Sequence, residues 1–286
     1  MVSRESTAGN RGAQPMNNPS IGVAVVTGAS AGIGEATAVR LASEGYHVAL
    51  VARRGSRLRS LARRIVTLGG HATAIVADLS RETERRRAYQ IIKRRLPPID
   101  VMINNAGLGW YGNAAEMSWK TARQLVRVNV EATAELTLLC LREMRKRGRG
   151  HIITVGSIAG GIPSQGVALY GATKAFIDNF TTALHRELMG TGVKVSVVRP
   201  GPVRTEFSEA ALRHPNGLHV PTERIGVSSE QVAAAIWGLI RNPRRVVYIP
   251  SWLRVVPWAE LAFGWIIDRI GPLLLRRQSA PGGRAA

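Results

Sequence analysis

The sequence has one cysteine among its 286 residues, which excludes a fold held together by internal disulfide bonds. Cys140 lies in the apolar stretch LTLLCLREM, and this setting predicts a buried, unreactive thiol. The six histidines are scattered, and His214 and His219 have no neighbouring carboxylates. No cluster has the spacing of a metal site, so we expect chemistry without a metal ion.

Acidic residues are also scarce. Only 19 Asp and Glu oppose 39 Lys and Arg, for a formal net charge of +20. This surplus favours polyanions, anionic membrane surfaces or acidic small molecules as partners. Most of it is arginine on predicted helical faces such as Arg53–Arg64, Arg81–Arg95 and Arg142–Arg149, where a solvated basic face is the simpler interpretation. Aromatic residues are not interleaved with these charges to stack bases, so nucleic acid is not an expected partner.

Long uncharged apolar runs are missing as well. Residues 1–20 lack the apolar core of a signal peptide and predict a disordered polar tail. Charged residues interrupt the apolar segment 251–277, so no stretch approaches the ~18 uncharged residues that a membrane span needs. We therefore expect a cytoplasmic protein, with peripheral membrane association left open, and a second disordered tail at 278–286.

Short β-branched apolar runs alternate with longer helical stretches between residues 21 and 250, the pattern of repeated βαβ units. It predicts one α/β domain, a Rossmann-type doubly wound seven-stranded parallel sheet with helices on both faces. Ligands in such sheets bind beyond the carboxyl ends of the strands. The strands are expected near Gly22–Thr27, His47–Ala52, Thr73–Val76, Val101–Asn104, His151–Val155, Lys194–Val198 and Val246–Ile249, and the helices near Ile33–Glu44, Arg54–Leu68, Arg81–Arg94, Trp119–Arg147, Tyr170–Met189 and Ser229–Arg241.

The first predicted strand runs directly into a glycine-rich turn and a helix. Glycines let the backbone approach a pyrophosphate, and a helix N-terminus offers free N–H donors with a favourable dipole. A turn of this kind after the first strand of a βαβ pattern indicates cofactor binding rather than an ordinary tight turn. Its expected binding residues are Gly28, Ser30, Ala31, Gly32, Ile33 and Gly34.

Arg53 and Arg54 follow the second predicted strand, where NAD-binding folds usually hold the ribose 2′-hydroxyl with an acidic residue. A guanidinium suits a 2′-phosphate instead, so the expected cofactor is NADP(H). The alternative is that the arginines only begin a solvated helix, and this alternative fits Arg57 and Arg59 better than Arg53 and Arg54.

The next two strand ends also carry candidate cofactor contacts. Asp78 and Leu79 follow the third strand, where Asp78 is either a hydrogen-bond partner for the adenine edge or a helix N-cap before Ser80. After the fourth strand, the short segment Asn104–Gly107 can pass close to the dinucleotide. Asn105, Ala106 and Gly107 are therefore expected to contact the cofactor.

Ser157, Tyr170 and Lys174 form the candidate catalytic group. Tyr170 and Lys174 are four residues apart, so on a helix they share one face. A nearby ammonium stabilises a phenolate and is expected to lower the tyrosine pKa towards the working range. Ser157, at the end of the fifth strand, can hold the substrate oxygen in the same cluster.

Together these motifs make the chain resemble the short-chain dehydrogenase/reductase family, over roughly Gly22 to Pro250. The resemblance implies hydride transfer between the nicotinamide and a carbonyl or alcohol, with Tyr170 as proton donor or acceptor and Ser157 stabilising the developing alkoxide. The motifs that carry it are TGxxxGxG at Thr27–Gly34, NNAG at Asn104–Gly107, Asn129, Ser157, YxxxK at Tyr170–Lys174 and Pro200–Gly201.

The resemblance also implies roles that the residues alone do not indicate. Asn129 would kink its helix and hold a water that links Lys174 to solvent, and Lys174 would bind the nicotinamide ribose. A homodimer or homotetramer would form through Trp119–Arg147 and Tyr170–Met189. Further implied cofactor contacts, with Thr205 on the carboxamide, are Pro200, Gly201, Val203 and Thr205.

Substrate selection falls to the loops beyond the strand ends. Trp110, Tyr111, Ile162 and Pro163 would form an apolar wall, which indicates a hydrophobic carbonyl or alcohol substrate. The segment Glu206–Val227 is either a mobile lid or an ordinary surface loop. A non-catalytic NADP(H)-binding sensor or scaffold is the competing class, although both Tyr170 and Lys174 are present.

The segment 251–277 extends beyond a minimal reductase and predicts an amphipathic helix. One face carries Ala259, Phe263, Ile266, Ile267, Ile270 and Leu274, while Glu260, Asp268 and Arg269 lie on the other half with Trp258 and Trp265. Flanking tryptophans and a trailing arginine pair suit a membrane interface. A helix packed on the sheet, a cover over the pocket or a subunit contact remain alternatives.

Overall fold

The computed structural model describes residues 20–212 and 226–274, and it contains one parallel sheet of seven strands in the order β3-β2-β1-β4-β5-β6-β7. The fold class predicted from the sequence is thereby confirmed. The tails at 1–19 and 278–286 and the central part of Glu206–Val227 lie outside the described residues. The strands are β1 (Gly22–Thr27), β2 (Tyr46–Ala52), β3 (His71–Val76), β4 (Ile99–Asn104), β5 (Gly150–Val155), β6 (Val193–Pro200) and β7 (Val246–Ile249).

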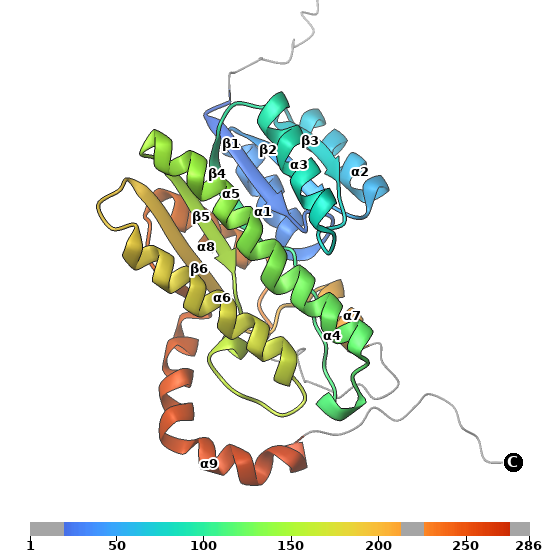
Figure 1. Ribbon diagram of the computed structural model, residues 1–286, viewed down its shortest axis with the longest axis vertical. Helices are drawn as coiled ribbons and strands as arrows, with labels where there is room; N and C mark the ends of the chain where they lie inside the picture. Colours follow the sequence, from blue (N-terminus) through green and yellow to red (C-terminus); the bar gives the residue numbers. More distant parts are fainter. Residues whose placement is uncertain (1–19, 213–225, 275–286) are drawn as a thin grey trace, which may run out of the picture.

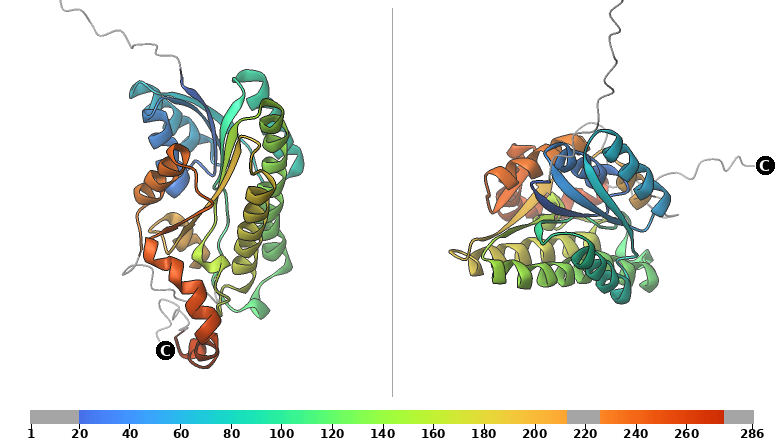
Figure 2. Two further views of the ribbon diagram at one scale, coloured as in Figure 1. Left: turned by 90° about the vertical axis from the view of Figure 1, so that its left-hand side faces the viewer. Right: turned by 90° about the horizontal axis from the view of Figure 1, so that it is seen from above.

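Helices cover both faces of the sheet, as the view from above shows (Figure 2). One face holds α1 (Gly32–Ser43), α2 (Gly55–Thr67) and α8 (Ser229–Arg241), and the other holds α3 (Glu82–Arg95), α5 (Ala132–Arg147) and α6 (Ala168–Glu187). Successive strand residues point to opposite faces, so Ala24 and Val26 join one core while Val25 joins the other.

Local sequence explains the helices well. In α2 the apolar residues Leu58, Leu61 and Ile65 recur at helical spacing and are buried, whereas the arginines between them face solvent. Ser228 and Gln231 form a reciprocal capping box at the start of α8. Cys140 is buried in α5 and burial raises the pKa of its thiol to about 12, in agreement with the predicted inert cysteine.

The chain departs from the predicted elements in two places. The helix predicted as continuous over Trp119–Arg147 consists of α4 (Trp119–Val126), a π-helical turn η2 (Arg127–Glu131) and α5. The segment expected to be a lid or a surface loop begins with a short helix, α7 (Glu206–Leu212). Three further short 3₁₀ segments are η1 (Ala114–Glu116), η3 (Ile158–Gly160) and η4 (Ser251–Val255).

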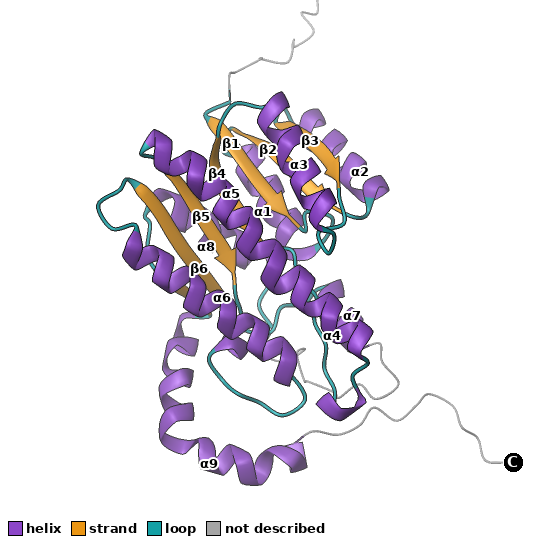
Figure 3. Cartoon of the chain, viewed as in Figure 1, coloured by secondary structure: helices purple, strands orange, loops and turns teal. Residues whose placement is uncertain are grey.

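The strand order reverses between β1 and β4, so the connections from these two neighbours leave in opposite directions and open a crevice at their carboxyl ends. In Figure 1, α4, α7 and the C-terminal helix α9 (Val256–Leu274) gather at that end of the sheet. Figure 3 shows that long loops occupy the same end. The fold thereby places these helices and loops together at the carboxyl ends of the strands.

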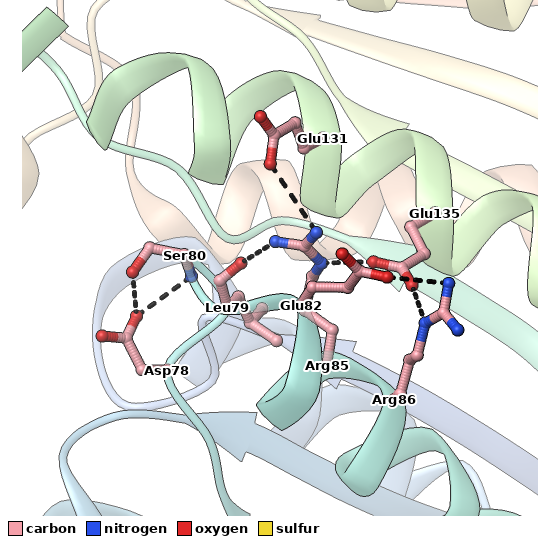
Figure 4. A network of polar contacts seen from close by, with 8 residues as sticks. All are labelled: Asp78, Leu79, Ser80, Glu82, Arg85, Arg86, Glu131 and Glu135. Carbon is pink, nitrogen blue, oxygen red and sulfur yellow. Dashed lines mark hydrogen bonds and ion pairs between the residues drawn. The ribbon is translucent and has the colours of Figure 1, made fainter. Parts of the chain in front are cut away.

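A nearly buried ion pair ties α3 to α5 (Figure 4). The Arg85 side chain is only 5% exposed; its Nε donates to Glu135 at 2.5 Å and its Nη1 to the carbonyl of Leu79 at 2.9 Å. Arg86 also bonds Glu135, at 2.9 Å, but its side chain is 67% exposed. The two arginines therefore share one carboxylate in very different surroundings.

We predict that Arg85→Met lowers the free energy of unfolding by about 3 kcal/mol, because it leaves a partly buried carboxylate with weaker compensation. Arg86→Met is the matched control and should lower the free energy of unfolding far less, since exposed pairs contribute little. Urea unfolding followed by circular dichroism measures both. Equal costs would mean that the burial of Arg85 does not determine its contribution.

Candidate active site

A cavity of about 780 Å³ opens at the carboxyl ends of the strands, at the crevice between β1 and β4. It extends from the glycine-rich turn to the tyrosine of the predicted catalytic group. Most of the predicted site residues line it: Gly28, Ser30, Ala31, Gly32, Ile33, Arg53, Arg54, Asp78, Leu79, Asn105, Ala106, Gly107, Tyr111, Ser157, Ile162, Tyr170, Lys174, Pro200, Gly201, Val203 and Thr205.

The glycine-rich turn forms one end of the cavity, and its three glycines lie at positions where a side chain would be strained or crowded. Gly28 and Gly32 have φ values of +67° and +56°, which L-residues rarely adopt. A Cβ on Gly34 would lie 2.4 Å from the carbonyl oxygen of Gly28 and 2.5 Å from Nδ2 of Asn105. Gly34 does not line the cavity; its missing side chain lets α1 pack against the turn.

Hydrogen bonds join the ends of β1 and β4 beneath this turn. The Thr27 hydroxyl accepts from the backbone N–H groups of Asn105 at 2.9 Å and Ala106 at 3.0 Å. The Asn105 side chain donates to the Thr27 carbonyl at 2.9 Å. The sequence indicates Thr27 only as part of the glycine motif, because its role in holding the two strand ends depends on a contact across 78 residues.

Arg54 lies at the rim of the cavity, where its Nε donates to the Ser30 hydroxyl at 3.1 Å. Its Nη1 bonds Glu206 at 2.8 Å, and Arg57 bonds the same carboxylate at 2.7 and 2.8 Å. Arg57 is exposed near the start of α2, as the sequence predicts, and its guanidinium is in addition paired with Glu206. Sequence spacing gives no signal for Glu206, which comes from α7.

Asp78 lines the cavity beside Leu79 and is not the N-cap of α3, which is Arg81. Its Oδ1 accepts from the backbone N–H of Ser80 at 3.0 Å and from the Ser80 hydroxyl at 2.8 Å. Partial burial acts to raise the pKa of Asp78, but the Ser80 hydrogen bonds and the charges of Arg53 and Arg81 lower it. Asp78 is therefore an ionised acceptor at the cavity wall.

The predicted catalytic side chains meet at the other end of the cavity. Tyr170 and Lys174 share one face of α6, and Ser157 follows β5 at the start of η3. The Lys174 ammonium lies 5.9 Å from the centroid of the Tyr170 ring and donates to the carbonyl of Val155 at 3.0 Å. All three side chains line the cavity.

Burial controls the protonation of this group. It raises the pKa of Tyr170 well above its ordinary value; Tyr111 acts in the same direction, and a hydrogen bond with Ser157 opposes the shift. Burial also lowers the pKa of Lys174 to about 8, although the Asp178 carboxylate opposes that shift. The expected lowering of the Tyr170 pKa by Lys174 does not hold here, because the ammonium is bonded to Val155 and the ring is desolvated.

Asn129 lies in the π-helical turn η2, where the helix is irregular, and its side chain is fully buried. It accepts from the backbone N–H of Leu108 at 2.8 Å and donates to the Leu108 carbonyl and the Thr173 hydroxyl, both at 2.9 Å. A Cβ on Gly107 would have Asn129 Oδ1 at 3.5 Å and Lys174 Nζ at 3.8 Å. Asn129 thus lies behind the cavity wall, close to Lys174.

The substrate wall differs in part from the one expected. Tyr111 and Ile162 line the cavity, whereas Trp110 and Pro163 are not among its lining residues. Trp110 is 3% exposed and belongs to a core cluster with Leu125 and Tyr170. Further residues at this end are Leu108, Gln124, Leu125, Val128, Val167 and Phe207. Of these, Phe207 lies in the segment Glu206–Val227, and the sequence provides no signal for Gln124, Leu125, Val128 and Val167.

α7 closes one side of the same region. The Phe207 ring lies 5.9 Å from the Tyr170 ring between centroids, and the backbone N–H of Tyr111 donates to the carbonyl of Ala211 at 3.1 Å. This helix therefore contacts Tyr170 and Tyr111 and, through Glu206, also Arg54 and Arg57.

These residues fit a phosphate-bearing dinucleotide. The glycine-rich turn lines the cavity, with no side chain at Gly28 or Gly32 to block it, and Arg54 supplies a cation at the rim. Within the described ranges, no group of three His, Cys, Asp or Glu side chains could hold a metal ion. The arrangement can position an elongated cofactor with one end beside a buried phenol.

The C-terminal helix α9 extends beyond the sheet rather than lying on it (Figures 1 and 2). Pro257, in its first turn, lies beside Gly161, next to η3. Large apolar residues on both halves of the predicted helical wheel are exposed, including Trp258 at 73%, Phe263 at 57% and Trp265 at 62%. The interpretation of a helix packed on the sheet is therefore wrong. No helix in the described part of the chain is long and apolar enough to cross a bilayer.

Residues 22–216 match the family model described as short chain dehydrogenase. The NADP-dependent 3-hydroxy acid dehydrogenase YdfG of Escherichia coli is 33% identical over 235 residues, which cover 78% of this chain and 91% of that protein. The ketoacyl reductase HetN of a Nostoc species is 35% identical over 229 residues, covering 79% and 77%. A short-chain dehydrogenase from Sphingobium yanoikuyae, solved with NADPH, superposes with a TM-score of 0.75 at 29% identity, covering 93% of this chain and all of that one.

Proposed function

The chain belongs to the short-chain dehydrogenase family, and on that premise we propose that it is an NADP(H)-dependent oxidoreductase that reduces the carbonyl group of a hydrophobic substrate. One observation carries the proposal. A single cavity is lined at one end by the glycine-rich turn and Arg54, and at the other by Ser157, Tyr170 and Lys174. Relatives named as a ketoacyl reductase and an NADP-dependent dehydrogenase support it.

The cofactor would lie along the carboxyl ends of the strands. The open backbone of Gly28–Gly34 and the N-terminus of α1 suit its pyrophosphate, and Arg53 with Arg54 suits a 2′-phosphate. Asp78 and Leu79 would line the adenine site, Asn105–Gly107 would pass beside the dinucleotide, and Pro200–Thr205 would contact the nicotinamide end. When bound, NADPH supplies the hydride for reduction.

Tyr170 would donate the proton to the substrate oxygen. Burial raises its pKa, so the phenol is protonated at neutral pH and can serve as the acid in carbonyl reduction. Ser157 would hold the same oxygen and stabilise the charge that develops on it. Lys174 would orient the cofactor ribose. The buried Asn129 would fix the position of the loop at Leu108 relative to the helix that carries Lys174, through its hydrogen bonds to Leu108 and Thr173.

The residues around Tyr170 favour an apolar substrate. Tyr111, Leu125, Val128, Ile162 and Phe207 line this end. Trp110 would support the wall from behind, and contact of Trp110 or Pro163 with the substrate stays a prediction. The competing function, a non-catalytic NADP(H) sensor, is disfavoured because the tyrosine, lysine and serine lie together at the cavity. A homodimer or homotetramer through Trp119–Arg147 and Tyr170–Met189, as the resemblance implies, also remains a prediction.

We predict that NADPH binds more tightly than NADH and that Arg54→Asp removes most of this preference, because the 2′-phosphate loses a guanidinium partner. Arg53→Asp, at the other arginine of the rim, should also weaken NADPH binding. Titration of nicotinamide fluorescence with each cofactor measures the dissociation constants. Arg59→Asp controls for the change in net charge. Equal affinities of the wild type for NADPH and NADH would contradict the assignment of these arginines.

We predict that Tyr170→Phe lowers kcat on a bulky ketone by roughly 10²–10⁴-fold, the usual contribution of a general acid, without weakening NADPH binding. Tyr111→Phe removes a hydroxyl from the same cavity and should change kcat far less. Steady-state rates and NADPH titrations on both variants test this. Substantial turnover in Tyr170→Phe would show that another group donates the proton.

We further propose that α9 binds the surface of an anionic membrane. Its exposed Trp258, Leu261, Phe263 and Trp265 suit the interfacial region. The exposed Arg254 can complement anionic headgroups, whereas Arg269 lies next to the exposed Asp268. The side chains of Ile267, Ile270 and Leu274 and the Arg276–Arg277 pair lie outside the described residues. A hydrophobic substrate held in such a membrane would be a lipid carbonyl compound.

The full chain should cosediment with vesicles that contain phosphatidylglycerol and bind much less to pure phosphatidylcholine. The double variant Trp258→Ser/Trp265→Ser should lose most of this binding, whereas Trp119→Ser, which removes an exposed tryptophan outside α9, should retain it. Loss of oligomeric mass in the double variant, with no vesicle binding in the wild type, would identify α9 as a subunit contact.

A further inference from the structure

Glu206 is the one acidic side chain, among the described residues that line the cavity, that is paired with the arginines at its rim. One oxygen bonds Arg54 at 2.8 Å, and both oxygens bond Arg57, at 2.7 and 2.8 Å. The three side chains are each about half exposed, so the pairs can exchange with solvent and ligands. Two cationic groups and one carboxylate therefore meet where the cavity opens.

This carboxylate binds the same guanidinium that the proposed cofactor requires. Arg54 also donates to Ser30 of the glycine-rich turn, so its side chain already points towards the expected phosphate site. A carboxylate and a phosphate both accept from the fork of an arginine in the same way. The hydrogen bonds of Arg54 and Arg57 hold the pKa of Glu206 down at about 2, so the carboxylate is charged at any working pH.

We propose that Glu206 is a cofactor-selectivity residue, whose carboxylate occupies Arg54 and Arg57 in the absence of cofactor and must be displaced by the 2′-phosphate of NADP(H). This inference rests on the proposed function. A cofactor with a 2′-phosphate exchanges one anion for another at the arginines. A cofactor without that phosphate leaves the Glu206 pairs intact, so its affinity is independent of them.

The exchange therefore narrows the difference in affinity between NADPH and NADH. Competition from Glu206 weakens NADPH binding and leaves NADH binding almost unchanged. Exposed ion pairs contribute little each, so removing two of them corresponds to roughly three- to tenfold in affinity. The effect must shrink as salt rises, because salt screens exposed charges.

α7 does not depend on Glu206 for its position. The Ser208 hydroxyl donates to the carbonyl of Val203 at 3.0 Å, and Ala211 accepts from the backbone of Tyr111 at 3.1 Å. Phe207 packs against Tyr170. These contacts keep the helix in place when the carboxylate is neutralised, so Glu206→Gln should change the charge without moving α7.

The experiment compares wild type, Glu206→Gln and Glu35→Gln by calorimetric titration with 2′,5′-ADP and with 5′-AMP, two probes that lack the nicotinamide. Glu35 pairs with Arg64 at 2.9 Å, joins α1 to α2 with similar exposure, and does not line the cavity. Glu35→Gln therefore removes the same charge and the same kind of pair. Each titration is repeated with NADPH and NADH, at low and at high salt.

We expect Glu206→Gln to bind 2′,5′-ADP and NADPH roughly three- to tenfold more tightly at low salt, with 5′-AMP and NADH unchanged within about twofold. Glu35→Gln should resemble wild type. Unchanged or weaker 2′,5′-ADP binding in Glu206→Gln, or an equal gain in Glu35→Gln, would overturn the inference. Failure of the wild type to bind NADPH and NADH alike would instead overturn the proposed function.

Discussion

The rest of the site depends on the contact between the carboxyl ends of β1 and β4. Here the strand order reverses, and Thr27 and Asn105 bond each other through both backbone and side-chain groups. The glycine-rich turn can then pass against Asn105 and Ala106 only because Gly28 and Gly34 have no side chains. This close approach leaves the backbone of the turn and the start of α1 open towards the cavity, which is the condition for binding a phosphate there.

Burial sets the chemistry at the opposite end of the cavity. Tyr170 and Lys174 are both desolvated, which disfavours the phenolate and the ammonium alike. Their positions are fixed by ordinary contacts: Lys174 by the carbonyl at the end of β5, and Tyr170 by the aromatic rings of Tyr111 and Phe207. A protonated donor in an apolar surround is suited to a hydrophobic carbonyl compound.

The large excess of arginine has more than one structural use. Arg85 is almost buried and connects α3, α5 and the backbone of Leu79, which lines the cavity. Arg54 and Arg57 are exposed and share the carboxylate of Glu206. The first arrangement supports the cavity wall, and the second leaves cationic groups within reach of a ligand. Net charge alone distinguishes neither, because burial and partners determine what each arginine does.

The sequence by itself determined the parallel α/β sheet, the glycine-rich turn, the arginines after β2 and the Tyr170–Lys174 pair. Each of these depends on periodicity or spacing within one element, which local sequence records directly. The arginines after β2 were also enough to indicate NADP(H), since a strand fixes the position of the residues that directly follow its end.

Only the tertiary structure decided which of these residues meet. The Arg54–Glu206 pair joins residues 152 positions apart, the irregular turn at Asn129 breaks a helix that appears continuous in the sequence, and Trp110 lies behind the wall it was expected to form. The sequence likewise did not indicate that both faces of α9 are exposed, because a helical wheel does not show which face packs against another element. Such features depend on packing between distant segments, and no local pattern encodes that packing.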